Sequence, residues 1–587
     1  MLDRLDPDAL FDGLEEAERT GFITSSSQGP EAPFAFSHEL VRQTLLAGIS
    51  LPRQQRLHLK IALAMEKIFA PCIEEHAAEV AYHLVKSGPY IDAGKAMSYL
   101  SLTGQILLRA GALEDARLTL AKALQYQAPD PVMHARTLAD LAGAERGLGD
   151  WNAATSHLEE AIGLYLGAGD LRSVGRIVFE MVESLAWTGR FDAAAEIAER
   201  GLNHLRSKDE DAYRYRLLAA LGYIQAASGA IEAARRAFDE VVASPAASPF
   251  LARVLAYRSA CSSNFLQLEA ALEDSRRSVE MSNPQSAPWT HALALSIVMR
   301  ALYQMGKPDQ ALKIAIELEP LARSVGQLAA LTFCISIRAW AEFGRWPDLA
   351  LLGRRIFDDL ALNRAASLSL FIAQSLAQMS LVEFLAGNWD SARSLAEEAC
   401  NREVQRTFVG VGPSMLLRLA GYSGQRDRTL ELADETRARL PIPQMANTIG
   451  AWLLLIGTVE GLAMVGERGR AAELYPLVRE LLESGVKCMY SEIRFPETVA
   501  GIAAGAAGDW ERAEEHFLAA RKQALELPHR LEEAEVRRFH AMMLIDRAAS
   551  GDRERARRLL GEALAIYTRV GMPRHVELTR KLRDQSA

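Results

Sequence analysis

Apolar residues recur every three or four positions along most of the chain, which is the spacing that places them on one face of an α-helix. The stretches "RLLAALGYIQAA" and "EAARRAFDEVVAS", on either side of Gly229, show this pattern. Helices of about 12 to 17 residues are expected in pairs, because turn-forming residues separate one apolar pattern from the next. The sequence therefore predicts a mainly helical protein.

One short signature marks these turns: a glycine, any residue, a bulky residue, an acidic or polar residue, any residue, and an alanine. It recurs in twelve units spaced 37 to 43 residues apart, for example "GDWNAA" at Gly149 and "GDWERA" at Gly508, and one unit, "LQLEAA" at Leu266, lacks the glycine. The glycine can end the first helix in the left-handed conformation, and the polar residue can cap the second.

Alanine closes the signature in most units and leaves room for the two helices of a hairpin to approach each other. A leucine in its place is expected to cost about 1–3 kcal/mol through overpacking. The alanines are Ala116, Ala154, Ala194, Ala234, Ala311, Ala392, Ala471, Ala513 and Ala556. Tryptophan lies two residues after the glycine in four units (Trp151, Trp346, Trp389 and Trp510), where we expect it to pack between hairpins rather than to stack on a ligand.

A single hairpin cannot bury both of its faces, so the hairpins are expected to stack into a superhelix with a long concave surface. We predict an all-α fold, with a tetratricopeptide-like α-solenoid of about 12 helical hairpins over residues 71–587. The units are longer than the ordinary tetratricopeptide repeat. They resemble the arrays that form the sensor region of bacterial STAND-class signalling ATPases, including the large ATP-binding LuxR-type transcription regulators.

Residues 1–70 follow a different plan. "DALFDGLEEAERTGFI" predicts a helix that ends near Gly21, "FITSS" and "PFAFS" predict two short strands around a polar turn, and "SHELVRQTLLAGI" predicts a second helix capped by Ser37. This order predicts a small winged-helix domain. The acidic first helix argues against DNA binding by this domain.

The segment from Phe34 and Phe36 to "HELVR" resembles the end of the winged helix in STAND-class regulators and in related cyclase-linked ATPases. The resemblance implies that His38 can approach the β-phosphate of ADP and sense the nucleotide, provided that an ATPase module is present. An imidazole can donate a hydrogen bond to a phosphate and changes charge near neutral pH. The alternative is a histidine that only caps or packs the small domain.

A phosphate-binding loop of the form GxxxxGK[ST] is missing from the sequence; the nearest string, "GPYIDAGKA", has the wrong spacing and ends in alanine. We therefore expect no cofactor in this chain, with ATP or ADP bound only where the chain is part of a longer parent protein. A winged helix without its ATPase suggests a truncated protein or a gene that has lost this module.

Charge and cysteine content narrow the function further. The chain carries 66 Lys and Arg against 75 Asp and Glu, a net charge of -9 with both signs interleaved, so direct nucleic-acid binding is not expected. The five cysteines are far apart, which indicates reduced thiols in the cytoplasm. The apolar run at 449–466 contains Glu460 and three glycines and is expected to be a buried helix, not a membrane span.

Candidate site residues are few. Arg300, Arg338 and Arg418 each lie six residues before the turn glycine of their repeat, so they could form a ladder on the concave wall for an anionic ligand or an acidic peptide segment. The alternative is that they pair with carboxylates of neighbouring helices. His76, Glu79 and His83 share a helix face, but the stretch resembles the family's linker helix, and we expect no metal site. No catalytic constellation is present.

The sequence therefore favours a non-enzymatic sensor and scaffold region. An effector or protein partner would bind the concave face, and the arm would regulate an upstream STAND-type ATPase or transcription regulator. The alternative is an autonomous tetratricopeptide-type adaptor for protein–protein interaction.

Overall fold

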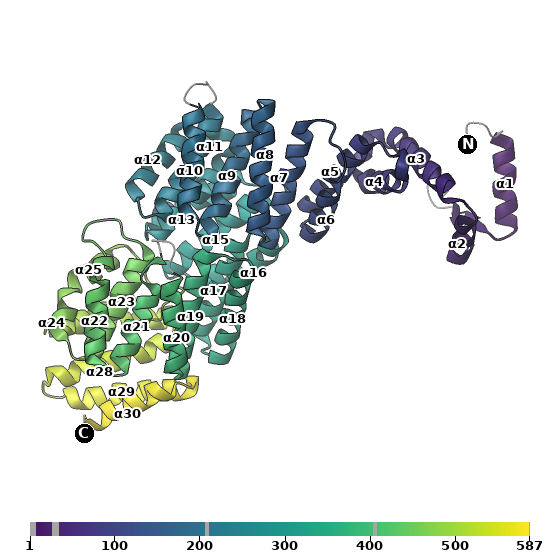
Figure 1. Cartoon of the computed structure of the whole chain (residues 1–587). Coiled ribbons are helices and arrows are strands. Elements are labelled where there is room, and N and C mark those ends of the chain that lie inside the picture. Colours follow the sequence, from purple (N-terminus) through teal and green to yellow (C-terminus); the bar gives the residue numbers. More distant parts are fainter. Residues whose placement is uncertain (1–6, 26–33, 206–210, 403–407, 586–587) are drawn as a thin grey trace. The chain divides into compact units, whose positions relative to one another are not determined.

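The computed structural model describes residues 7–25, 34–205, 211–402 and 408–585 (Figure 1). Most of these residues are helical. The described sheet consists of two strands, β1 (Ile23–Ser25) and β2 (Phe34–Phe36), which pair antiparallel with Ile23 opposite Phe36. The predicted all-α class is confirmed.

The N-terminal elements follow the predicted order of helix, two strands and helix. They are α1 (Pro7–Arg19), β1, β2, α2 (Glu39–Ala47) and α3 (Leu51–Ile68), followed by a 3-10 helix, η2 (Ala70–His76), and α4 (Ala77–Lys86). The predicted turn between the strands, residues 26–33, lies outside the described residues. The winged helix itself stays a prediction.

The predicted cap on α2 is wrong. His38, not Ser37, occupies the N-cap position, and its side chain accepts no hydrogen bond from the helix. The Ser37 hydroxyl donates instead to the carbonyl oxygens of Gly21 and Phe22. Ser37 therefore joins the end of β2 to the turn after α1.

Internal contacts divide the chain into two units, residues 1–106 with 118–133, and residues 107–117 with 134–587. The predicted boundary between a winged-helix domain and the repeats, at residue 70, falls within the first unit, where α3 ends and η2 begins. This boundary stays a prediction.

From α5 onward the described helices form twelve antiparallel hairpins, followed by a last helix, α30 (Pro573–Gln585) (Figure 1). The first helices of the hairpins are α5 (Ala93–Arg109), α7 (Pro131–Leu148), α9 (Leu171–Trp187), α11 (Asp211–Ala227), α13 (Leu251–Asn264), α15 (Pro288–Gln304), α17 (Leu328–Arg345), α19 (Ser369–Ala386), α21 (Val411–Tyr422), α23 (Ile449–Met464), α26 (Pro496–Ala506) and α28 (Arg530–Arg547). The second helices are α6 (Leu113–Ala123), α8 (Trp151–Ala168), α10 (Phe191–Leu205), α12 (Ile231–Ala243), α14 (Leu268–Met281), α16 (Pro308–Ser324), α18 (Leu349–Ala365), α20 (Trp389–Asn401), α22 (Arg426–Thr436), α24 (Arg468–Glu473) with α25 (Tyr475–Glu483), α27 (Trp510–Glu526) and α29 (Asp552–Val570). The predicted α-solenoid is confirmed.

The turn signature has the predicted geometry. Gly149 and Gly508 take φ of +85° and +75°, and the carboxylates of Asp150 and Asp509 accept hydrogen bonds from the backbone amides three residues later. In the unit without a glycine, Leu266 itself takes φ of +56°. The turn of this unit is therefore left-handed too, although a residue with a Cβ atom disfavours that conformation.

The nine alanines of the signature are all buried, as predicted. The tryptophans behave less uniformly. Trp151 is buried and packs edge-on against Trp187, with ring centroids 5.4 Å apart, whereas Trp346 is 65% exposed. The packing role is confirmed for Trp151 and wrong for Trp346, whose repeat has no left-handed glycine because Gly344 lies inside α17.

Within the second unit, the turn of a hairpin touches the connection that follows a hairpin four or five places later. A Cβ atom added to Gly149 would lie 2.8 Å from the Cα atom of Ala366, and one added to Gly387 would lie 2.9 Å from Pro573. The helices show the same contact pattern, since α17 touches α28 and α19 touches α30. Successive turns of the superhelix thus pack directly on each other, and glycine permits the close approach.

The first helices form an inner layer that is buried on nearly every side. In α15 all residues but one from Ala292 to Gln304 are buried, and in α23 the buried residues run without a break from Ile449 to Leu462. This confirms that the apolar run at 449–466 is a core helix. No described helix has the length and hydropathy needed to span a bilayer.

Candidate partner-binding surface

The inner surface of the C-terminal hairpins is occupied by the chain itself. Residues 486–495, called here the inner segment, connect α25 to α26 without forming a helix, and only Lys487 among them is exposed. Irregular backbone is normally found at the surface because its polar groups need partners. The inner segment finds its partners on the first helices of the hairpins.

The first contacts of the inner segment are with α15. The backbone amide of Lys487 donates to the carbonyl oxygen of Gln304 at 2.7 Å, and the Cys488 thiol donates to that of Tyr303 at 3.0 Å. Tyr303 and Cys488 are 185 residues apart in the sequence. The segment is therefore held by contacts that join distant repeats.

Arg300 lies under the inner segment. Its guanidinium donates to the Asn264 side chain at 2.8 Å and lies 4.3 Å from the ring centroid of Phe333 and 5.8 Å from that of Tyr490. Tyr490 belongs to the inner segment. Burial lowers the pKa of Arg300, with only partial compensation from Tyr490.

Further along, the inner segment contributes to a fully buried ion-pair network. Glu492 accepts from Arg418 at 2.7 Å, and Arg494 donates to Glu460 at 2.6 Å and pairs with Glu535 at 2.9 Å. Arg418 also donates to Glu460, at 2.9 Å. Helices α21, α23 and α28 are thus joined through charges that have no contact with water.

The network sets the ionisation of its members. Burial alone would raise the pKa of Glu460, but Arg418 and Arg494 hold it at about 2, so this carboxylate is ionised at neutral pH. At Glu532 burial outweighs the attraction of Arg494 and raises the pKa to about 8. Glu532 is therefore protonated at neutral pH. Burial also lowers the pKa of His575, to about 3.

The structure brings two of the three predicted arginines to one surface. Arg300 and Arg418 both contact the inner segment, which presents Tyr490 to the first and Glu492 to the second. Arg338 does not join them, since it pairs with Glu319 at 3.2 Å and Glu342 at 3.1 Å and is about one-third exposed. The ion pairs match the alternative interpretation for Arg338 and Arg418. Ligand binding by the three residues stays a prediction, and a ligand at Arg418 would have to displace Glu460 and Glu492.

His38 lies at the start of α2 and is exposed. Within the described part of the chain its side chain has no hydrogen-bond partner, while its carbonyl oxygen accepts from Val41 and Arg42. The imidazole is thus accessible to a group from outside the chain. The role as nucleotide sensor stays a prediction.

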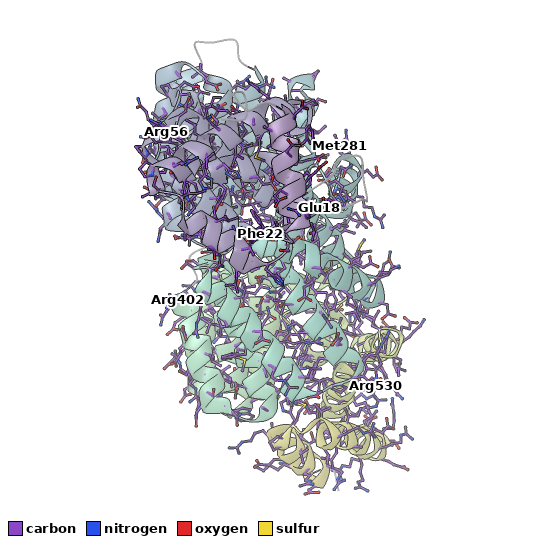
Figure 2. All side chains as sticks on the ribbon, turned by 90° about the vertical axis from the view of Figure 1, so that its right-hand side faces the viewer. Glu18, Phe22, Arg56, Met281, Arg402 and Arg530 are labelled. Atoms are coloured by element: carbon purple, nitrogen blue, oxygen red, sulfur yellow. The ribbon has the colours of Figure 1, made fainter. Side chains whose placement is uncertain are left out.

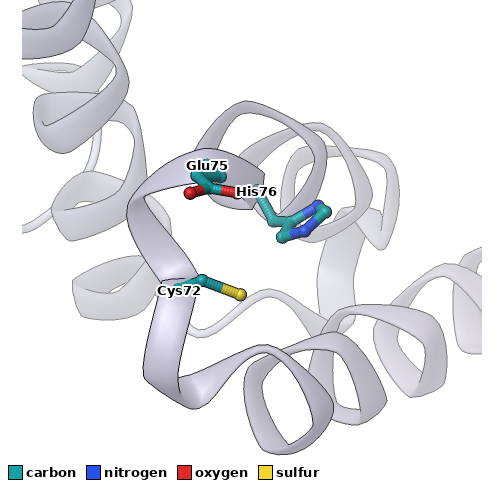
Figure 3. A group of neighbouring side chains, drawn as sticks. All are labelled: Cys72, Glu75 and His76. Atoms are coloured by element: carbon teal, nitrogen blue, oxygen red, sulfur yellow. The ribbon is translucent and has the colours of Figure 1, made fainter.

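The three residues of the predicted helix face do not converge. The His83 imidazole turns to α3, where its Nδ1 lies 2.8 Å from Nδ1 of His58, and only His76 lies near Glu79. A different group, Cys72, Glu75 and His76, brings its potential ligand atoms within 4.8 Å of one another (Figure 3). A structural zinc site usually takes four ligands, and this group offers three.

A small-molecule effector would need a cavity. One cavity of about 340 Å³ lies among α12, α13 and α14 and is lined by Arg258, Asp274 and Cys261 among others. Arg258 already donates to both carboxylate oxygens of Asp274, at 2.7 Å each. The charges of Arg258 and Asp274 are therefore satisfied within the chain.

Sequence reasoning missed the inner segment. The signal was the interval between Gly466 and Gly508, in which "GVKCMYSEIRFP" carries no helical apolar spacing although its neighbours do. An irregular stretch in that place would ordinarily be interpreted as a surface loop.

No protein-family model matches this sequence, and no curated protein matches it. Among solved structures, the chain is similar to the APC/C hetero-tetramer Cut9-Hcn1, with 13% identity, coverage of 93% of this chain and 98% of that one, and a TM-score of 0.45. It is also similar to a Rap protein complexed with competence and sporulation factor, with 12% identity, coverage of 70% and 99%, and a TM-score of 0.41. Identities this low concern the fold and say nothing of a shared function.

Proposed function

We propose that the chain is a non-enzymatic sensor and scaffold arm that acts in the cytoplasm. A protein partner or effector binds the superhelix, and residues 7–68 dock on a STAND-type ATPase module whose state they regulate. The support for docking is the exposure of large apolar side chains in this short stretch.

Eleven large hydrophobic side chains between residues 11 and 68 are exposed, compared with thirteen in all the remaining described residues. Leu40 is 75% exposed and Phe36 is 45% exposed, and Phe22, labelled in Figure 2, is about half exposed. Exposed apolar surface of this density is typical of an interface with another folded body. Among the described residues of the same stretch, Ile23 and Ala62 are the only buried apolar residues.

The resemblance of "HELVR" and its preceding strand to STAND-class proteins supports an ATPase as the body that covers this surface. Because the sequence lacks a phosphate-binding loop, the purified chain alone is expected to show no heat of binding with ADP or ATP. Micromolar affinity in calorimetry would overturn the assignment of nucleotide binding to a separate module.

The docking is tested on a phosphate-loop ATPase module encoded in frame upstream of the chain or beside it. We expect the chain to change the rate of ATP hydrolysis by this module and the variant F36S/L40S to lose the effect. The matched control is F357S, which removes a 59% exposed phenylalanine from α18. If the chain does not change the rate of ATP hydrolysis, the regulatory role is refuted and the autonomous adaptor is the remaining function.

His38 has a test of its own. Replacing it by leucine is expected to leave the melting temperature of the chain unchanged, because the side chain is exposed, and to make a full-length parent signal constitutively. A parent with unchanged activity would remove His38 from the switch.

A further inference from the structure

Four consecutive hairpins carry an arginine at the same position of their first helix, thirteen residues before the residue that makes the turn. The turn residues are Gly149, Gly189, Gly229 and Leu266, and the arginines are Arg136 in α7, Arg176 in α9, Arg216 in α11 and Arg253 in α13. Neighbouring first helices pack side by side, since α9 touches α11 and α11 touches α13. Equal register therefore aligns Arg176, Arg216 and Arg253 into a ladder across these hairpins, and Arg136 has the same register on α7.

The rungs are close enough to repel one another. Burial lowers the pKa of Arg216, and the positive charges of Arg253, Arg176 and Arg172 lower it further against the pull of Glu180. Arg172 lies one helical turn before Arg176 on α9. Among the described residues, Arg136, Arg172, Arg176 and Arg216 have no carboxylate in an ion pair. These four arginines therefore form a cationic surface that Glu180, which already pairs with Arg146 and Arg253, offsets only in part.

The ladder lies on the side of α9 that other helices leave open. α8 and α10 pack against α9 from the second layer, α11 packs beside it, and the run from Ile177 to Trp187 is buried except for Glu180. The residues that remain accessible are Arg172, Ser173, Arg176 and Glu180. They form one stripe at helical spacing on the inner surface.

The base of the ladder, which is the region around Arg253, contains buried polar atoms without partners. Glu183 accepts from Arg253 at 3.0 Å and from Arg146 through the same carboxylate oxygen, while its other oxygen has no partner in the described structure. The hydroxyl of Tyr257, which is 2% exposed, is likewise unpaired there. Unpaired buried polar atoms are costly and mark a place where a further hydrogen-bonding group fits.

Aromatic rings pack against the arginines at the base of the ladder. The Arg253 guanidinium lies 5.0 Å from the ring centroid of Trp289 and 4.7 Å from that of Phe179. The Arg146 guanidinium also lies near Trp289, 5.7 Å from its ring centroid. Such stacking fixes the guanidinium planes and leaves their edges to bind carboxylates.

We propose that this ladder binds an extended acidic peptide segment of a protein partner, with a carboxylate on every third residue. The axes of packed helices lie about 8–10 Å apart, which sets the separation of the rungs. A polyproline II segment rises about 3.1 Å per residue and has three residues per turn, so every third side chain lies on one side about 9 Å from the next. The proposal rests on the scaffold function and names its partner class.

Charge favours a peptide over a nucleic acid. The chain as a whole carries a net charge of -9, which repels a polyanion outside the immediate contact, whereas a short acidic peptide meets only the ladder. The single line of arginines also matches one extended chain better than a duplex.

The experiment measures fluorescence anisotropy of labelled (Glu-Pro-Pro)4 with the full chain at low and at physiological salt. We expect saturable binding that weakens with salt, and at least a tenfold higher Kd for the variant R176Q/R216Q. The matched control R235Q removes an arginine from α12 that pairs with Glu232 outside the ladder, and it should leave Kd unchanged. A peptide of the same composition with its four glutamates adjacent should bind at least several-fold more weakly.

Absence of binding, or an equal loss in R235Q, would overturn the ladder as a peptide site. Equal affinity for the adjacent-glutamate peptide would overturn the spacing, and tighter binding of a single-stranded RNA of equal charge would overturn the peptide assignment. None of these variants touches residues 7–68. If the unmodified chain regulates the ATPase but fails to bind the peptide, only the ladder is refuted.

Discussion

Replacement of Arg494 by methionine tests the buried network most sharply. Arg494 is fully buried, donates to Glu460 at 2.6 Å and to the Tyr422 hydroxyl at 3.0 Å, and pairs with Glu535 at 2.9 Å. Methionine fills a similar volume but leaves these carboxylates with fewer partners. Breaking a buried ion pair from one side typically costs about 3–5 kcal/mol.

The structure places the expected loss near the lower end of this range. Glu460 keeps Arg418 at 2.9 Å and the Tyr422 hydroxyl at 2.6 Å, and Glu535 keeps Arg538 at 2.7 Å. No carboxylate is left wholly alone, so we expect the free energy of unfolding to fall by about 3 kcal/mol.

The assay is urea unfolding followed by far-UV circular dichroism, with R470M as the matched control. Arg470 pairs with Asp434 at the surface, where an ion pair contributes about 0–1 kcal/mol. If R494M loses no more stability than R470M, the ion pairs of the inner segment are not buried in solution and the reasoning is refuted.

Three further changes probe ionisation, packing and the turns. The pKa of Glu532 is about 8 in the folded chain and lower in the unfolded chain, so stability should fall as pH rises from about 5 to 8, and urea melts of E532Q should lack this fall. In α27, A513L should lose about 1–3 kcal/mol in thermal melts, whereas A519L at an exposed position should be near neutral. Ala548 is exposed with φ of +52°, so A548G should raise stability by about 0.5–1 kcal/mol, and a loss would contradict a left-handed turn there.

The parts of the fold that depend on neighbouring residues could be predicted from the sequence. The turn signature from Gly149 to Ala154 includes every residue that determines its geometry. Gly149 can be left-handed, Asp150 caps the next helix, and the Ala154 side chain is small enough for close packing. The same causes recur in each unit, so the hairpins and their number followed. The packing prediction was wrong for Trp346 because its turn lacks the left-handed glycine on which the pattern depends.

The inner surface could not be predicted in the same way, because it is made by contacts between distant repeats. Register alone indicated that Arg300 and Arg418 lie on the inner helices. It could not indicate that Glu492, 74 residues beyond Arg418, would be the anion that meets it. The superhelical pitch decides which segments meet, and it arises from small angles summed over many hairpins.

The arginine ladder shows both limits together. Its rungs are visible in the sequence as a constant offset from the turns, but Arg538 has the same offset from Gly551, and Arg300 and Arg418 share a constant offset of their own. Arg176 and Arg216 differ from Arg418 in that Glu460 and Glu492 pair with Arg418, whereas no carboxylate of the described residues forms an ion pair with Arg176 or Arg216.

The central claim is that residues 486–495 fill the inner surface of the C-terminal hairpins, so that a partner must bind elsewhere on the superhelix. Native-state hydrogen exchange tests it directly, because the amides of Lys487 and Phe495 donate to Gln304 and Glu532 within the protein. We predict that they exchange as slowly as the core helix α23. Exchange within seconds would show that the inner surface is open and would contradict the account.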